Sequence, residues 1–189
     1  QRAAWREQIG VVFDECNLPV VLKVRDVGHI MKNIFKTWKN EKFTDYLVRF
    51  DVPLNKKIKE LSKGMKMKLS IAIASSHDSR LLILDEATSG LDPVVRREIL
   101  DIFREFIEDE QHAVFLSSHI TSDIEKIADY VMLIHKGKIL FTENKDELLY
   151  NYGVVRCSKE LAALIPKELI VGKEENAFET NVLVKDIGK

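Results

Sequence analysis

The sequence predicts an α/β fold in which a mostly parallel sheet is flanked by helices, with a small helical subdomain and a short α+β segment near the C-terminus. Apolar runs at residues 81–84 and 113–116 each end abruptly in polar residues. This pattern is typical of strands buried on both faces of a parallel sheet. Between the two runs, Val95, Ile99 and Phe106 recur at helical spacing. Strands that alternate with helices favour an α/β architecture.

The first strand ends in two adjacent carboxylates, in the run Leu81-Leu82-Ile83-Leu84-Asp85-Glu86. Burying a strand that ends in two acids is costly unless the acids meet a cation or a reacting water. In phosphoryl-transfer sites the first acid can hold Mg²⁺, often through water, while the second polarises the attacking water. Asp85 and Glu86 are candidates for these roles. The alternative is a strand end that exposes both acids to solvent.

A helix start precedes this strand, in the run Leu61-Ser62-Lys63-Gly64-Met65-Lys66. Ser62 is suited to be the N-cap, because its hydroxyl can accept a hydrogen bond from an otherwise unpaired backbone N–H. Gly64 leaves the first turn open to close approach of a ligand. Free N–H groups, a hydroxyl and lysines make this helix start suitable for phosphate. The alternative is an ordinary capped helix whose Leu69 and Ile73 face the core.

The second strand, residues 113–116, leads into Ser117-Ser118-His119 at its carboxyl end. Open parallel sheets place their ligands at this edge. If the two strands are neighbours, we expect His119 to lie beside Asp85 and Glu86. A single histidine after a strand is more often structural than catalytic, so this segment alone leaves both roles open.

In their order along the chain, these segments resemble the motifs of ATP-binding-cassette (ABC) proteins. Residues 61–65 are similar to the signature motif, residues 82–86 to the Walker B strand, residues 89–92 to the D-loop, and His119 to the switch histidine. The resemblance covers roughly residues 5 to 150. It implies a P-loop NTPase-like cassette, N-terminally truncated, that uses ATP and Mg²⁺.

The resemblance also implies roles for individual residues. Asp85 would hold Mg²⁺ through its water shell, and Glu86 and His119 would be the catalytic residues. Ser62 would reach the γ-phosphate bound by a second copy of the domain, and Asp92 would link the two sites. The full set of residues expected to bind ATP is Ser62, Lys63, Gly64, Met65, Asp92 and Asp14.

Three positions depart from the commonest motifs of the family. Lys63 stands where the signature usually has its first glycine, and Met65 stands where it has glutamine. This form is similar to that of exporters of drugs, peptides and antibiotics. Asp14, followed by Glu15, replaces the Q-loop glutamine. An aspartate oxygen can still face Mg²⁺ or its water, although the side chain is shorter and charged.

The phosphate loop of the family, Walker A, is absent from the sequence. It requires G-x-x-x-x-G-K followed by serine or threonine, so that backbone N–H groups and a lysine hold the phosphates. None of the 8 glycines is followed by Lys-Ser or Lys-Thr. We expect that the sequence begins inside the domain and that this fragment is inactive alone. The alternative, a degenerate gene product, is disfavoured by the intact Glu86 and His119.

Two helices are expected between the Q-loop and the signature, because apolar residues recur there at helical spacing. Pro53 would stop the second helix. The resemblance implies a helical subdomain at about residues 22–75, within a partial ABC ATPase domain of residues 1–150. The residues that form the two stripes are Val27, Ile30, Met31, Ile34 and Phe35, and then Phe43, Leu47 and Phe50.

The remaining residues, 151–189, change character and resemble the C-terminal accessory segment of some exporter ATPases. Strands are predicted at residues 154–157 and 181–185, separated by a short helical piece at residues 158–164. Just before this segment, residues 130–140 predict two strands joined by a tight turn at Lys136-Gly137.

Composition adds few constraints on function. The formal net charge of -1 provides no electrostatic reason to expect nucleic acid. The 2 cysteines, Cys16 and Cys157, lie far apart and lack the spacing of metal ligands, which indicates buried or free thiols in a reducing compartment. No apolar run is long enough to cross a bilayer.

Together these features predict the ATP-binding subunit of an ABC exporter, which couples ATP binding and hydrolysis at a dimer interface to transport. The expected partners are polytopic membrane subunits and a second nucleotide-binding domain, at the cytoplasmic face of the cell membrane. No nucleic acid is expected. The alternatives are a soluble ABC ATPase that acts on ribosomes or nucleic acid, and a regulatory cassette without turnover.

Overall fold

The computed structural model describes residues 2–176 and 178–186, and it divides the chain into two compact units, Gln1–Ile127 and Ala128–Lys189. The division falls earlier than the domain boundary expected at residue 150. The reason is that the segment after Ile127 begins with a β-hairpin that pairs with itself, while the sheet of the first unit has its own three strands. We describe each unit by itself.

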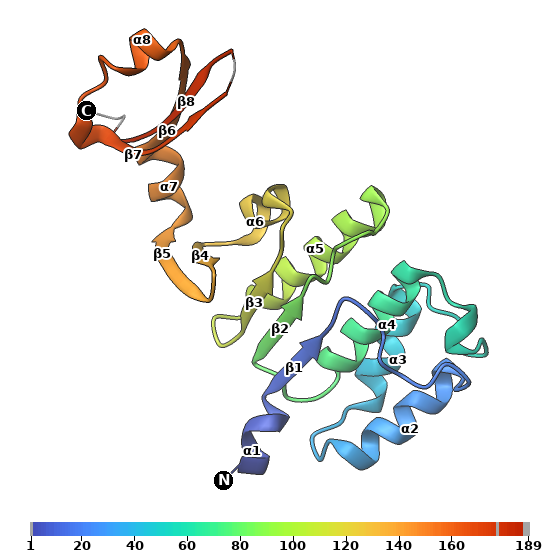
Figure 1. Ribbon diagram of the computed structural model, residues 1–189. Coiled ribbons are helices and arrows are strands. Elements are labelled where there is room, and N and C mark those ends of the chain that lie inside the picture. The colour runs from blue at the N-terminus through green and yellow to red at the C-terminus, as the bar shows by residue number, and fades with distance from the viewer. Residues whose placement is uncertain (1, 177, 187–189) are drawn as a thin grey trace. The chain divides into compact units, whose positions relative to one another are not determined.

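The first unit is built on a parallel sheet of three short strands, β1 (Ile9–Val12), β2 (Leu81–Asp85) and β3 (Ala113–Ser117), in the order β1-β2-β3 (Figure 1). Val12 lies opposite Leu84 in the register, and Asp85 lies opposite Ser117. The predicted strands at residues 81–84 and 113–116 are thereby confirmed as neighbours. Because the strands are parallel, their carboxyl ends meet at one edge of the sheet.

The two faces of this sheet differ in burial. Successive strand residues point to opposite faces, and Val12, Leu82 and Leu84 are buried against the helices. On the other face, Phe115 is 55% exposed and Val11 is exposed as well. The prediction that both faces are buried is therefore wrong for the described residues, because the helices of the described chain cover only one face.

Helices α2 (Val24–Ile34), α3 (Asn40–Arg49) and α4 (Lys63–Ser75) and the short 3₁₀ helix η1 (Ile58–Glu60) lie between β1 and β2. The two predicted helices are confirmed. The buried face of α2 differs from the predicted stripe, because Ile30 and Ile34 are exposed. The residues of α2 that are buried are Val24, Val27, Gly28 and Met31.

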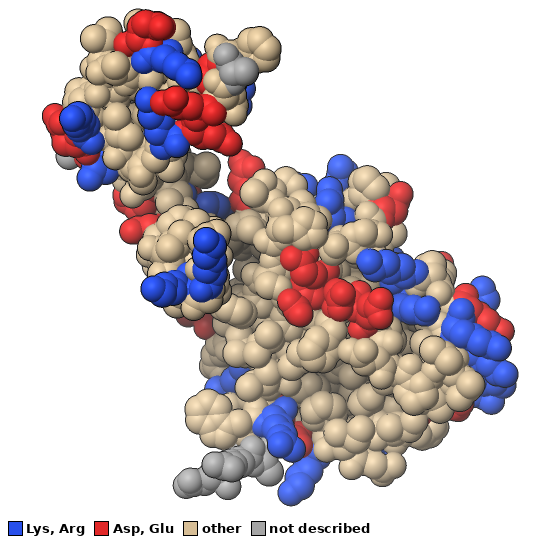
Figure 2. Space-filling view, viewed as in Figure 1, with Lys and Arg blue, Asp and Glu red and all other residues tan. Residues whose placement is uncertain are grey.

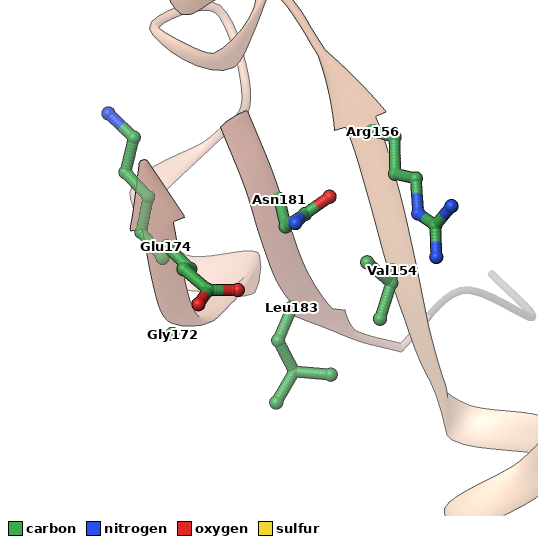
Figure 3. A pocket seen from close by; sticks show the side chains of 7 residues that line it. Val154, Arg156, Gly172, Glu174, Asn181 and Leu183 are labelled. Carbon is green, nitrogen blue, oxygen red and sulfur yellow. The ribbon is translucent and has the colours of Figure 1, made fainter. Parts of the chain in front are cut away.

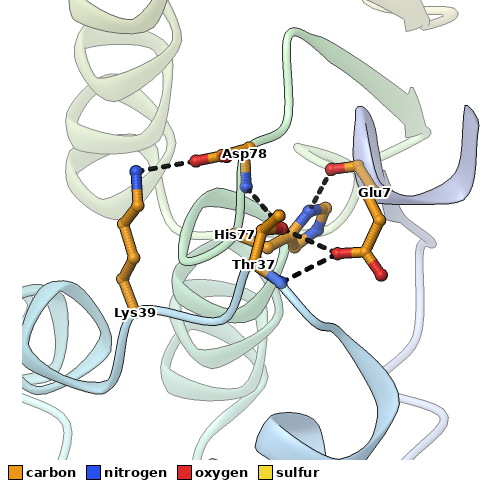
Figure 4. Close-up of polar contacts among 5 residues, drawn as sticks. All are labelled: Glu7, Thr37, Lys39, His77 and Asp78. Carbon is orange, nitrogen blue, oxygen red and sulfur yellow. Dashed lines mark hydrogen bonds and ion pairs between the residues drawn. The ribbon is translucent and has the colours of Figure 1, made fainter. Parts of the chain in front are cut away.

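The N-terminal helix α1 (Arg2–Glu7) is tied to this helical region by a polar cluster (Figure 4). The Glu7 carboxylate accepts hydrogen bonds from the Thr37 hydroxyl at 2.7 Å and the Thr37 N–H at 3.1 Å. These bonds, the hydroxyl first, lower the pKa of Glu7. His77 Nδ1 lies 2.8 Å from the Glu7 carbonyl oxygen, and burial lowers the pKa of His77. Lys39 pairs with Asp78 at 2.7 Å beside them.

Two helices follow the ends of β2 and β3. Helix α5 (Pro93–Ile107) is capped by Asp92, whose carboxylate accepts a hydrogen bond from Val94 N–H at 2.9 Å. Proline at the first helical position is favourable there, because its missing N–H would be unpaired anyway. Helix α6 (Thr121–Ile127) is short and packs on α5. The apolar face of α5 is buried through Ile99, Leu100, Ile102, Phe103 and Phe106.

The second unit begins with the predicted hairpin, β4 (Tyr130–His135) and β5 (Lys138–Asn144). At the turn Lys136 and Gly137 have φ values of 49° and 73°. Two consecutive residues with positive φ are the mark of a type I′ turn, whose twist matches that of the flanking strands. The predicted turn is therefore confirmed. Helix α7 (Lys145–Asn151) follows, capped by the Asn144 side chain.

The unit continues as a three-stranded antiparallel sheet of order β6-β8-β7. The two predicted strands are present, but the third, β7, was missed, because Gly172 and the charged residues after it mask its pattern. An open hollow lies on one face of this sheet, beside Val154, Asn181 and Leu183 (Figure 3). The elements are β6 (Tyr152–Cys157), α8 (Lys159–Ala162), η2 (Lys167–Leu169), β7 (Ile170–Glu175) and β8 (Thr180–Lys185).

Candidate functional site

Several of the predicted site residues meet at the carboxyl edge of the β1–β3 sheet. Asp14 follows β1, Asp85 ends β2, Glu86 comes next, and His119 follows β3. Asp14 and Asp85 are both exposed. Figure 2 shows acidic side chains gathered over the carboxyl ends of β1 and β2. This edge therefore has a concentration of negative charge that suits a cation.

A short contact at this edge joins Glu86 and His119. Glu86 Oε2 lies 2.7 Å from His119 Nδ1. A carboxylate can only accept, so Nδ1 carries the proton in this contact and Nε2 is left for another partner. The side chain of Glu86 is 32% exposed and that of His119 is 69% exposed. Both groups are thus reachable by solvent or a ligand while they hold each other.

The backbone of Glu86 has an unusual conformation. Its φ is 50°, in the left-handed region that residues with a side chain rarely adopt. Such a conformation costs about 1–3 kcal/mol and persists only where the surroundings hold it. Here the Glu86 N–H donates to both the carbonyl and the hydroxyl oxygen of Ser117, at 3.2 Å each. The end of β3 therefore holds the strained residue that follows β2.

Ser117 also holds Asp85. Its hydroxyl donates a hydrogen bond to Asp85 Oδ1 at 2.6 Å. Sequence reasoning assigned no role to Ser117, although its place at the end of the strand beside β2 was a usable signal. Asp85 offers an exposed carboxylate, the kind of ligand that Mg²⁺ takes from proteins together with waters and substrate phosphates. Among the described residues no group of three or more His, Cys, Asp or Glu could hold a metal by itself.

The start of α4 has the geometry predicted for Ser62. Its hydroxyl accepts a hydrogen bond from Met65 N–H at 3.2 Å, which confirms Ser62 as the N-cap. A side chain at Gly64 would approach Val95 to 2.9 Å, so the absence of a Cβ lets α4 lie close to α5. Met65 packs against the core.

Lys63 lies against the segment that resembles the D-loop. A Cβ placed on Gly90 would be 2.9 Å from Lys63 Nζ, and Gly90 has a φ of 64°. Glycine fits this position for two reasons: it adopts the left-handed backbone conformation without strain, and it leaves room for the neighbouring Lys63 ammonium group. Asp92 uses one carboxylate oxygen to cap α5. Sequence reasoning did not place Lys63 beside Gly90, because residues 63 and 90 lie far apart in the chain.

The structure therefore forms two groups from the predicted site residues. Glu86 and His119 form one group at the sheet edge together with Asp85, while residues 62–65 form the other at the start of α4. Within the described residues, no hydrogen bond or ion pair joins the two groups.

The parallel β1–β3 sheet, with its helices and with acids and a histidine at its carboxyl edge, forms an α/β fold consistent with a truncated P-loop NTPase-like cassette. A comparison with solved structures shows the same fold. An ATP-binding cassette in a dimeric post-hydrolysis state, bound to ADP and Pi, matches with a TM-score of 0.66 at 18% identity. The match covers 76% of this chain and 65% of that chain.

Comparisons of the sequence with a family model and with known proteins identify what this chain is similar to. The ABC transporter family model matches residues 1–89. The lantibiotic transport ATP-binding protein SrtF of Streptococcus pyogenes is 41% identical over 100 residues, which are 50% of this chain and 43% of that protein. The bacitracin transport ATP-binding protein BcrA of Bacillus licheniformis is 44% identical over 85 residues, which are 45% of this chain and 28% of that protein. Residues 1–89 are therefore similar to the ATP-binding proteins of ABC transporters.

The chain matches less than half the length of these two relatives. In the described part of the chain, no helix combines the length and the apolar character that crossing a membrane requires.

Proposed function

We propose that this chain is the catalytic part of an ATP-binding subunit of an ABC exporter, in which ATP binding and hydrolysis at a dimer interface drive transport. The contact between Glu86 and His119, at 2.7 Å on the edge where Asp85 also ends its strand, is the observation that carries the proposal. The relatives named for lantibiotic and bacitracin transport support the exporter assignment.

In this proposal the three side chains at the sheet edge have separate tasks. Asp85, whose carboxylate is oriented by the Ser117 hydroxyl, would hold Mg²⁺ through its water shell. The bound Mg²⁺ would neutralise charge on the transferred phosphoryl group. Glu86 would accept the proton of the attacking water. His119 would keep Glu86 in place through Nδ1 and present Nε2 to the γ-phosphate.

The charge of this edge argues that the chain needs further groups to hold ATP. Asp14, Glu15, Asp85 and Glu86 all lie at or just past strand ends, so a polyphosphate would meet negative charge there. A phosphate loop supplies backbone N–H groups and a lysine that offset this repulsion. The sequence contains no such loop. We therefore propose that the chain alone does not hydrolyse ATP and that the longer protein does.

The start of α4 would serve a second nucleotide. Ser62 is exposed, and its hydroxyl proton remains available to donate while its oxygen caps Met65 N–H. The group of residues 62–65 makes no hydrogen bond or ion pair with Glu86 or His119 among the described residues. This separation supports a site in which Ser62 and the Gly64 backbone contact the γ-phosphate bound by a second copy.

The expected partners follow from this arrangement. A second nucleotide-binding domain would complete each site. The movement of the two domains on ATP binding and hydrolysis would be passed to polytopic membrane subunits of an exporter. The subunit would then be peripheral at the cytoplasmic face of the membrane. No nucleic acid is proposed, because the formal net charge of -1 offers no basic attraction.

Replacing Glu86 by glutamine tests the proposed function in the full-length protein. The amide keeps the shape of the side chain but cannot accept a proton, so turnover should fall by about 100-fold or more while ATP binding persists. Glu110→Gln, on the exposed loop before β3, is the matched control and should leave turnover unchanged. Turnover of the Glu86→Gln variant within a fewfold of wild type would overturn the proposal.

A further inference from the structure

The most completely buried carboxylate among the described residues has no part in the chemistry proposed above. Asp123 on α6 is 0% exposed, and neither carboxylate oxygen has a hydrogen-bond partner within the described chain. The charged group beside it is Arg96 on α5, whose Nε lies 3.6 Å from Asp123 Oδ1. The side chain of Arg96 is itself only 28% exposed.

Stability alone is a poor explanation for such a pair. Removing two charges from water is costly, and replacing a buried ion pair with apolar side chains of similar volume is often neutral or stabilising. A buried pair instead restricts how two elements can pack, because any other arrangement leaves a charge unpaired. The elements that Arg96 and Asp123 join are α5 and α6.

These two helices connect the functional segments of the site. Helix α5 is capped by Asp92, the last residue of the segment that resembles the D-loop, and α6 begins two positions after His119. A second arginine of α5 also fixes α6, since Arg104 donates a hydrogen bond to the Lys126 carbonyl oxygen at 2.8 Å. Helix α6 is thus held to α5 at Asp123, near its start, and at Lys126, near its end.

We propose that Arg96 and Asp123 form a positioning pair that sets His119 against Glu86 and couples the placement of His119 to the D-loop end of α5. Asp123 lies four positions after His119 in the sequence. A shift of α6 on α5 would therefore move the imidazole out of reach of the Glu86 carboxylate. The kinetic consequence of the pair rests on the proposed function, whereas its effect on the His119 contact does not.

The structural arm of the test uses the present chain with ¹³C-labelled histidine, whose ring signals are read by NMR. The His119 signal is assigned with His119→Ala, and Glu86→Gln shows where it moves when the contact is weakened. Arg96→Met and Asp123→Asn should move the His119 signal in the same direction as Glu86→Gln. Arg96→Lys, which retains the charge, should leave it near the wild-type position.

The chain provides a matched control pair. Arg25 Nε also lies 3.6 Å from a carboxylate oxygen, that of Asp26, but both of these side chains are about half exposed. Arg25→Met removes the same chemical group from an exposed pair on α2, so it should leave the His119 signal unchanged. A comparable shift in Arg25→Met would show that the effect is a general response to lost charge, and would overturn the proposal.

A double variant separates positioning from folding. Arg96→Met together with Asp123→Leu removes both charges, so the domain should remain folded even if either single variant unfolds. The His119 signal should still be displaced. In the full-length protein the double variant should lower kcat by about tenfold or more, with KM within about twofold. A wild-type His119 signal in a folded double variant would overturn the proposal.

The two proposals fail in different ways. If the wild-type full-length protein has no ATPase activity, the proposed function is wrong, and the NMR result on the present chain still decides the role of the pair. If the protein hydrolyses ATP but the folded double variant keeps both kcat and the His119 signal, only the positioning pair is wrong.

Discussion

His119 Nδ1 lies 2.7 Å from Glu86 Oε2, although the two residues belong to segments that follow different strands. Their meeting depends on the parallel register, in which Asp85 lies opposite Ser117. The Ser117 hydroxyl and carbonyl then hold the Glu86 backbone in its left-handed conformation. The pair is thus formed by the alignment of the two strands.

Removing the imidazole should show whether this contact is catalytic. In the full-length protein, His119→Ala should lower ATP turnover by about 100-fold or more, because Glu86 loses the group that orients it and the phosphate loses a donor. Steady-state kinetics and nucleotide-binding measurements would be compared with those of His29→Ala, an exposed histidine of α2. Turnover within a fewfold of wild type would make His119 structural.

The present chain should not bind Mg-ATP detectably. Its sheet edge carries acids, and it has no phosphate loop to provide the compensating N–H groups and lysine. Isothermal titration calorimetry of the chain would measure this, with the full-length protein as the positive control. Micromolar binding by the chain would contradict the prediction and would require a different kind of nucleotide site.

Ser62 should act across a dimer interface. Full-length subunits carrying Ser62→Arg are mixed with subunits whose Walker A lysine is replaced, under conditions in which subunits exchange. In the mixed dimer both lesions fall on one composite site, so the other site is intact and some activity or nucleotide-driven dimerisation should return. Each parent alone has two damaged sites and should show neither. Mixtures that behave as the average of the parents would refute action in trans.

Stability of the chain should fall at mildly acidic pH because of His77. Its ring stacks on Phe35 at 4.1 Å, and burial lowers its pKa, so protonation is less favourable in the folded state than in the unfolded state. The lowered pKa of His77 therefore stabilises the folded state above the unfolded pKa of about 6.5, and this stabilisation is lost as pH falls below that value. His77→Gln should reduce the loss of urea stability between pH 7 and pH 5, whereas exposed His29→Gln should not.

The lowered pKa of Glu7 also makes the folded state less stable as pH falls, but at more acidic pH than for His77. Glu7 contributes stability above the unfolded pKa of a glutamate, about 4.3, which is lost as pH falls below that value. Measurements at pH 7 and pH 5 therefore avoid most of the Glu7 effect. A pH dependence unchanged by His77→Gln would contradict the assignment to His77.

The open face of the β1–β3 sheet should become buried in the full-length protein. Phe115 is 55% exposed in this chain, so Phe115→Thr, which keeps strand propensity, should cost under about 1 kcal/mol of unfolding free energy here. In the full-length protein the cost should exceed about 2 kcal/mol. Leu84→Ala, at a buried position on the other face, should cost about 2–5 kcal/mol in both. If Phe115→Thr lowers the unfolding free energy equally little in the present chain and in the full-length protein, this face of the sheet stays exposed in both.

Several elements of the fold could be predicted from the sequence, because they depend on local chemistry. Apolar runs ending in polar residues marked β2 and β3, a serine before a helical pattern marked the N-cap of α4, and Lys136-Gly137 marked a tight turn. These signals depend on residues close in sequence. Strand β7 was missed for the same reason, because its Gly172 and following charges provide no local signal of a strand.

The strands β2 and β3, the helix cap of α4 and the candidate acids and histidine could thus be predicted from the sequence, because these are properties of neighbouring residues. Which of these residues contact one another depended on tertiary packing. The register of β2 on β3 placed Ser117 on Asp85 and His119 on Glu86, and the packing of α5 placed Arg96 beside Asp123. Such contacts depend on how strands and helices align in space, and no single segment of the chain encodes that alignment.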